Sequence, residues 1–217
     1  ERGNGNFLAS NTTAEAFLNS SSPVWRPTST GFYTGRDYGG SENQNLEDIV
    51  SWSFRKQAGF FDVVTYTGDG TGPREIAHNL GCKPGCIIIK NLDQSYGWAV
   101  WVKSFDLNEY DSAYILLNTG DASTYTGTPF VSQLNVGSRD PSANFYVKND
   151  SLTNANGIDY VAYLFADGDD AAAQVFGDDG DENIIKCGSY TGNGSADGPT
   201  IDCGFEPQWL LIRNTSN

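Results

Sequence analysis

The sequence predicts an all-β fold of antiparallel jelly-roll sandwiches, on the strength of three observations. Short apolar segments recur between turns rich in Gly, Asn, Asp and Pro. Several of these segments alternate in side-chain size with the two-residue period of a half-buried strand. No stretch has the 3.6-residue period of an amphipathic helix. Many short strands without helices are typical of two packed antiparallel sheets.

One complete unit is expected between residues 58 and 167 and should contain eight strands. A further half-buried strand is expected from Leu46 to Phe54, with Val50, Trp52 and Phe54 on one face. The eight expected strands are Phe61–Tyr66, Arg74–His78, Cys86–Asn91, Gly97–Lys103, Ala113–Asn118, Val131–Val136, Asn144–Val147 and Tyr160–Phe165.

Most of the pattern of residues 60–91 returns at residues 184–214. Tyr66-Thr67-Gly68 matches Tyr190-Thr191-Gly192 at an offset of 124, and Pro84 matches Pro207 at an offset of 123. The difference of one residue falls in a glycine-rich turn, where insertions are tolerated. Residues 43–54 match residues 154–165 at an offset of 111. The sequence therefore predicts a tandem repeat.

This repeat divides the chain into four parts. Residues 1–57 form the C-terminal part of one sandwich, 58–167 a complete sandwich, 168–183 an acidic linker, and 184–217 the N-terminal part of a further sandwich. Each partial sandwich leaves strand edges unpaired, so we expect the two parts to complete one another within a chain or between chains. The absence of Met and the interrupted repeats indicate a piece of a longer protein.

Charge and hydropathy exclude two classes of partner. The chain has 13 basic and 27 acidic residues, a net charge of −14, which repels nucleic-acid backbones. The longest apolar run, Cys86 to Ile89, is too short to span a bilayer. We therefore expect neither nucleic-acid binding nor membrane insertion.

The four cysteines are too few for a disulfide scaffold in a chain of this length. Cys82 and Cys86 flank a proline turn, and the repeat places Phe205 and Trp209 at the same two positions. Cys187 and Cys203 lie on strands expected to be adjacent. Each pair is a candidate disulfide, and buried free thiols are the alternative.

The linker and its flanks are rich in carboxylates. Asp167, Asp169, Asp170, Asp178, Asp179 and Asp181 offer the oxygen ligands that calcium prefers, although their spacing is not that of an EF-hand. A solvated acidic linker is the simpler interpretation. No other cofactor is expected.

Catalytic motifs are weak. His78 is the single histidine and lies in a polar stretch without a G-x-S-x-G context, so a catalytic triad is unsupported. The glycine-rich run from Thr67 to Gly72 lacks the lysine and helix of a phosphate-binding loop and is predicted to be a hairpin turn. A pair of glycosidase carboxylates stays open, because sequence gives no separation between acids.

Aromatic residues offer an alternative to a purely structural role. Trp98 and Trp101 lie on opposite faces of one expected strand, so one indole faces away from the core unless both faces are covered. Packing beneath a loop is the simpler interpretation. If exposed, Trp98 or Trp101 would stack on a sugar together with Tyr96 and Tyr125.

Several phrases resemble a repeat of marine tailed-phage virion structural proteins of the tail-fibre-like type. These phrases are GFFDVVTYTG at 59–68, HNLG at 78–81 with the following Pro84, NANGIDYVAYLF at 154–165 and the stretch 177–195. The resemblance covers nearly the whole chain and implies concanavalin-type or jelly-roll sandwiches. The chain departs from it at Val102-Lys103, where the family often has a histidine, and no catalytic residue carries over.

The resemblance implies a non-enzymatic virion structural or adhesion protein, part of a fibre or surface appendage, outside the host cell. Its partners would be other virion proteins, copies of itself and a host surface glycan. An extracellular carbohydrate-binding module or a polysaccharide depolymerase is the alternative.

Overall fold

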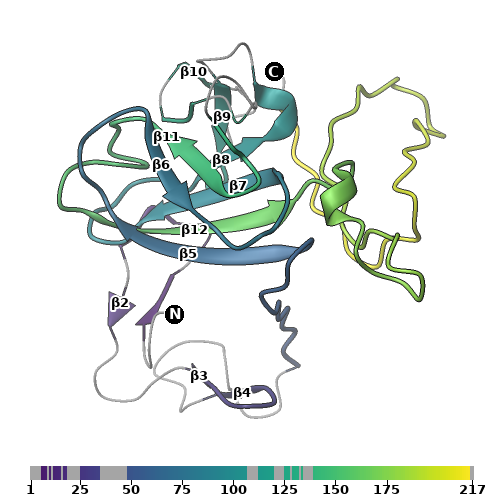
Figure 1. Ribbon diagram of the computed structural model, residues 1–217, viewed down its shortest axis with the longest axis horizontal. Coiled ribbons are helices and arrows are strands. Elements are labelled where there is room, and N and C mark those ends of the chain that lie inside the picture. Colours follow the sequence, from purple (N-terminus) through teal and green to yellow (C-terminus); the bar gives the residue numbers. More distant parts are fainter. Residues whose placement is uncertain are drawn as a thin grey trace.

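The computed structural model describes residues 6–8, 10, 12–15, 17–18, 25–34, 48–106, 112–119, 125–127, 129–131, 133 and 139–215. Within this part the chain is nearly all β, as predicted, and no helix there is long and apolar enough to cross a membrane. The elements are β1 (Asn6–Phe7), β2 (Phe17–Leu18), β3 (Trp25–Pro27), β4 (Phe32–Thr34), β5 (Phe61–Thr67), β6 (Arg74–Ala77), β7 (Pro84–Asn91), β8 (Ala99–Val102), η1 (Lys103–Phe105), β9 (Ser112–Leu116), β10 (Tyr125–Gly127), β11 (Asn144–Val147), β12 (Asp159–Ala166) and η2 (Ala171–Ala173) (Figure 1).

Six strands form the main sheet in the order β10-β9-β8-β7-β12-β5, and every neighbouring pair is antiparallel. Strand β12 occupies a central position between β5 and β7. Ala162 at its middle lies opposite Val64 on one side and Ile89 on the other. A strand paired on both sides satisfies its backbone hydrogen bonds, so β12 can be buried along most of its length.

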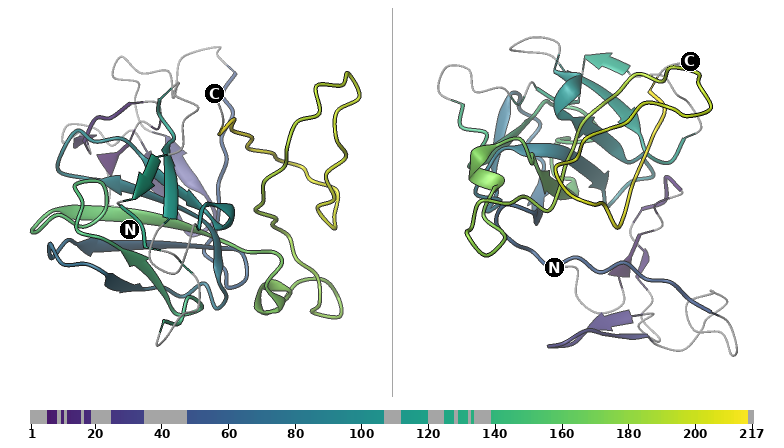
Figure 2. Two further views of the ribbon diagram at one scale, coloured as in Figure 1. Left: turned by 90° about the horizontal axis from the view of Figure 1, so that it is seen from above. Right: turned by 90° about the vertical axis from the view of Figure 1, so that its right-hand side faces the viewer.

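The inner face of this sheet carries the core. Ile87, Ile89 and Leu164 have no exposed surface. A second, two-stranded sheet of β6 and β11 adds Ile76 and Phe145 to the same cluster. Figures 1 and 2 show this small sheet lying against the larger one. Each strand places every second side chain in this core, because successive residues of a strand point to opposite faces of the sheet.

The outer face of the main sheet is also largely covered. Val161 is 1% exposed and Lys90 has no exposed surface, although both point away from the core cluster of β12 and β7. The Lys90 ammonium donates to the main-chain oxygen of Thr13 at 3.2 Å and to that of Asn91 at 2.7 Å. The N-terminal segment therefore covers part of this face, beneath β12 and β5 in Figure 1.

The strands predicted for two segments are absent from the described residues. Residues 48–54 are extended and exposed but pair with no strand, and residues 46 and 47 lie outside the described residues. Residues 184–215 likewise contain no strand, although they match β5 to β7 in sequence. In Figure 2 they follow η2 (Ala171–Ala173) and form loops beside the main sheet. The expected strand 131–136 is described only at 131 and 133, next to an isolated bridge between Phe130 and Val147.

The turns of the matched segment nevertheless recur. Gly70 and Gly194, which are 124 residues apart, have φ of +69° and +67°, a region that glycine favours. The amide of Thr71 donates to the Asp69 carboxylate at 2.8 Å, and the amide of Ser195 donates to the Asn193 side chain at 2.9 Å. The local turn chemistry is thus retained where the strand pairing is not.

Candidate functional site

Trp101 is a core residue. It is 1% exposed, and its indole Nε1 donates to Asp106 Oδ1 at 2.9 Å. The Asp106 carboxylate also accepts from the Ser112 hydroxyl and, at 3.1 Å, from the amide of Gln133. The idea that Trp101 is a sugar-stacking surface is therefore wrong for this structure, because a stacking ring must be open on one face.

Trp98 is covered on the opposite side of the sheet. It is 6% exposed, its indole Nε1 donates to the main-chain oxygen of Thr12 at 3.2 Å, and its ring stacks on Tyr163 with centroids 6.3 Å apart. Both faces of the strand are thus covered, and a sugar has no access to Trp98 either. Tyr96 is 38% exposed. The Tyr125 side chain lies outside the described residues.

The glycine-rich turn after β5 is held by a polar cluster. The buried Asn154 side chain donates to the Asp69 carboxylate at 2.9 Å and to the main-chain oxygen of Thr71 at 2.7 Å. Arg74 donates to Asn154 Oδ1 at 2.8 Å and forms an ion pair with Asp69 at 3.2 Å. The amide of Thr71 and then the Asn154 amide lower the pKa of Asp69 to about 2.

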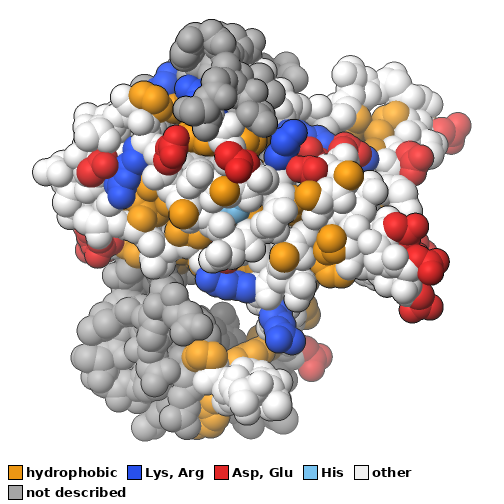
Figure 3. All heavy atoms as spheres, viewed as in Figure 1, with side chains coloured by type: hydrophobic (Ala, Val, Ile, Leu, Met, Phe, Trp, Pro, Cys, Tyr) orange, Lys and Arg blue, Asp and Glu red, His pale blue; other side chains and the backbone are white. Residues whose placement is uncertain are grey.

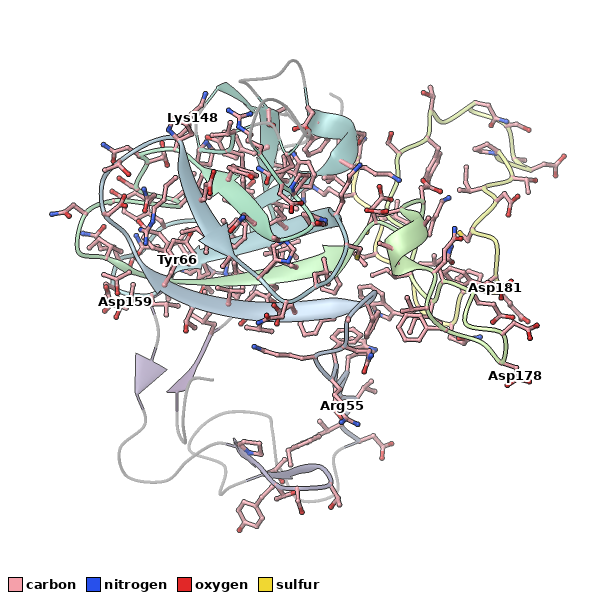
Figure 4. The ribbon with its side chains drawn as sticks, in the orientation of Figure 1. Arg55, Tyr66, Lys148, Asp159, Asp178 and Asp181 are labelled. Carbon is pink, nitrogen blue, oxygen red and sulfur yellow. The ribbon has the colours of Figure 1, made fainter. Side chains whose placement is uncertain are left out.

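This cluster brings together two motifs that are far apart in the sequence, residues 67–72 and 154–157. Tyr66, at the start of the turn, lies under the Arg74 guanidinium and stacks on Tyr160 with centroids 5.3 Å apart (Figure 4). Its hydroxyl donates to the main-chain oxygen of Thr153 at 2.5 Å. The arrangement fixes the loop after β5 against residues 153–160.

The predicted calcium ligands do not converge. Asp167 and Asp169 each accept a hydrogen bond from Lys103 at 2.5 Å, and Lys186 also contacts Asp169. These bonds, from Lys103 first and Lys186 second, lower the pKa of Asp169. Asp170 accepts from the amides of Lys83 and Ala172. Their oxygens are thus occupied by protein donors.

The remaining acids of the linker, Asp178, Asp179 and Asp181, are exposed. Asp178 and Asp181 point outward at the right of Figure 4, and Figure 3 shows acidic side chains gathered there. The described part of the chain holds no group of three or more His, Cys, Asp or Glu side chains that could bind a metal ion. Calcium binding stays a prediction without structural support.

All four cysteines are free thiols, and their neighbours are not the expected ones. Cys82 is buried with its sulfur 3.7 Å from the main-chain oxygen of Leu80, and burial raises its pKa to about 11. Cys187 packs against Gly85 next to Cys86, with its sulfur 3.6 Å from the oxygen of Ala166. Cys86 and Cys187 are therefore the adjacent pair, because residues 183–187 return to the start of β7.

Burial also determines the state of His78, which is 7% exposed. Its Nδ1 accepts from the amide of Leu80 at 3.1 Å, so Nε2 carries the proton that faces the oxygen of Pro141 at 3.2 Å. Desolvation is the main cause that lowers its pKa. Burial therefore favours the neutral form of the His78 ring.

Two extended segments expose apolar side chains. In residues 48–54, Val50 is 75% and Trp52 70% exposed, and in residues 207–214, Leu210 is 63% and Ile212 64% exposed. The two segments touch where Phe54 and Trp209 meet edge to face at 6.2 Å. Residues 48–54 and 207–214 form no sheet together, and completion of the partial sandwiches within or between chains stays a prediction. Exposed apolar groups on unpaired extended backbone are typical of interaction surfaces.

A family model described as "Domain of unknown function (DUF7483)" matches residues 1–217. The chain belongs to the DUF7483 family. No curated protein and no solved structure matches it.

Sequence reasoning missed the most connected residues of this DUF7483 chain. Asn154 belonged to a recognised motif, but nothing in a single sequence indicates that its amide reaches back to Asp69. Lys90 was expected on a strand, and a lysine there gave no sign of being buried beneath Thr13. The one available signal was recurrence, because Asn-x-Asn and the cation after three aliphatic residues both appear twice.

Proposed function

We propose that this chain is a non-enzymatic structural and adhesion protein. The main support is that its buried and clustered polar side chains bind other groups of the protein. Asn154, Asp106 and Asp169 are each engaged by several protein donors, and His78 is buried. The apolar side chains exposed in residues 48–54 and 207–214 suit assembly better than chemistry.

We further propose that the complete unit is a jelly-roll or concanavalin-like sandwich. The six-stranded sheet and the β6–β11 sheet share one core cluster, which supports two packed layers. Crystallography of residues 58–167 tests this topology. A single curved sheet with no facing layer would contradict it.

The proposed setting is a phage particle, in a fibre or surface appendage outside the host cell. The partners would be copies of the same unit, other virion proteins and a host surface glycan. This setting rests on the resemblance of residues 59–68 and 154–165 to virion repeats. The net charge of −14 is compatible with a partner other than nucleic acid.

Mass spectrometry of purified particles, with immunogold labelling, tests this proposal. We expect peptides from β7 and β12 in the particle fraction at many copies per particle, and gold on an appendage. Detection only in the cytoplasmic fraction, or turnover of a host polysaccharide by the purified protein, would reject a structural role.

Carbohydrate binding has weaker support, because only Tyr96 among the proposed stacking rings is both described and exposed. A glycan array with the unchanged protein and Tyr96→Ala tests it. Binding that is lost on this substitution would favour a lectin-like module. A uniformly negative array would leave assembly as the better proposal.

A further inference from the structure

Two hairpins of the chain correspond to one another. Phe7 pairs with Phe17 in β1–β2, and Tyr114 pairs with Tyr125 in β9–β10. The first strand of each hairpin is followed by Asn-Thr, at residues 11–12 and 118–119. The hairpins are therefore equivalent parts of successive repeats, and the turns that begin with Asn-Thr are equivalent turns.

The first of these turns docks onto the complete unit. The main-chain oxygen of Thr13 accepts from the Lys90 ammonium at 3.2 Å, and that of Thr12 accepts from the Trp98 indole at 3.2 Å. Lys90 closes β7, and it has no exposed surface. The turn of one repeat thus covers a cation at the end of β7 in the next.

The second turn makes the corresponding contact with the segment that follows. Arg213 lies 123 residues after Lys90, at the end of the segment that matches β7 in sequence. Its Nη2 donates to the main-chain oxygen of Thr119 at 2.7 Å. The donor is again a cation that follows three aliphatic residues, and the acceptor is again a carbonyl of the turn after the hairpin's first strand.

We propose that these contacts are two instances of one junction, in which each repeat presents its β7 cation to the hairpin turn of the repeat before it. The partner surface is therefore a copy of the same unit. A head-to-tail contact that recurs without closing generates an open linear array. Main-chain carbonyls as acceptors allow the turn sequence to vary between repeats while the cation is kept.

The junction deepens the structural role proposed above and depends on the repeat organisation, but not on a virion location. It also explains why a lysine stands at position 90, since a β-strand by itself needs no cation there. Because a buried ammonium needs hydrogen-bond acceptors, the preceding turn is part of the folded environment of β7.

Hydrogen exchange of matched variants tests the junction. We expect Lys90→Met to increase exchange about tenfold in residues 10–15, and Arg213→Met to increase it similarly in residues 112–119, each without affecting the other junction. Arg213→Lys supplies the residue type found at the first junction and should restore protection. Lys148→Met, on a cation away from both turns, is the control.

Thermal melting shows which variants remain folded. If Lys90→Met unfolds the unit, Arg213→Met still tests the second junction. Unchanged exchange at both turns would overturn the junction, as would equal increases with Lys148→Met. Mass spectrometry of purified particles does not depend on the hydrogen-exchange result. A failure of the virion proposal can therefore be told apart from a failure of the junction.

Discussion

Strand β7 and residues 207–214 have closely similar sequences and opposite environments. PGCIIIKN lies between β8 and β12, with Ile87 and Ile89 fully buried. PQWLLIRN has no strand partner, with Leu210 and Ile212 63% and 64% exposed. The comparison teaches that this pattern becomes a strand only where neighbours supply hydrogen bonds and cover both faces.

Core truncation should separate the two segments most strongly. Ile87→Ala removes buried methyl groups and should lower the free energy of unfolding by about 2–5 kcal/mol. Leu210→Ala, at the matching position, should change it by less than about 0.5 kcal/mol. Urea unfolding followed by tryptophan fluorescence measures both. Similar losses for the two variants would mean that residues 207–214 are packed as β7 is.

The loop held by Asn154 gives the next largest effect. Asn154→Ala leaves the Asp69 turn without its buried donor and should cost about 1–3 kcal/mol. Asn156→Ala, at the exposed position of the same motif, should cost less than about 0.5 kcal/mol. Chemical denaturation gives both values. The matching turn at 193–195 forms the same kind of local hydrogen bond. Asn193→Ala should therefore also lower the free energy of unfolding only slightly.

Protonation of His78 should produce a smaller, pH-dependent effect. Its pKa is lowered in the folded protein mainly by desolvation, so the unfolded chain binds the proton more readily. Its contribution to stability is therefore complete above about pH 6.5 and declines as the pH falls below that value. Urea midpoints between pH 8 and pH 5 measure the decline.

His78→Asn is the matched variant for that titration, and it should flatten the slope of stability against pH between pH 8 and pH 5. The position that matches His78 in the C-terminal segment is Ile201, which is 48% exposed and does not titrate. An unchanged slope in His78→Asn would assign the decline to other groups.

Thiol reactivity should show that Cys86 and Cys187 are shielded, with no change in stability. Burial raises the pKa of Cys187 to about 12, and burial also raises that of Cys86. Because the thiolate is the reactive form, both should react slowly with iodoacetamide at pH 8 in the folded protein and fast in urea. Peptide mass spectrometry measures the rates. Rapid native labelling at Cys86 would contradict a closed outer face.

Sequence patterns predicted the fold class well because alternation and turn residues act locally. The expected strands at 61–66, 86–91, 144–147 and 160–165 lie within β5, β7, β11 and β12. Pairing was harder to predict, because a strand needs partners that the pattern does not name. The segments 48–54 and 184–215 have the pattern and lack the partners.

The candidate site was predicted less well for a related reason. Trp98 and Trp101 were considered for sugar stacking, but whether an indole is open depends on what covers it, here Thr12 for one and the core for the other. Likewise, the acidic spacing around Asp169 could not indicate that Lys103 and Lys186 would occupy it. The contact that covers Trp98 spans 86 residues of sequence, and the contact between Lys103 and Asp169 spans 66.

Amide hydrogen exchange of β7 against residues 207–214 in the monomeric protein is the most direct measurement. The account predicts strong protection for residues 87–90, lost only on global unfolding, and exchange near the unprotected rate for residues 209–212. Equal protection of the two segments in the monomer would contradict it, because residues 207–214 would then already be a paired strand.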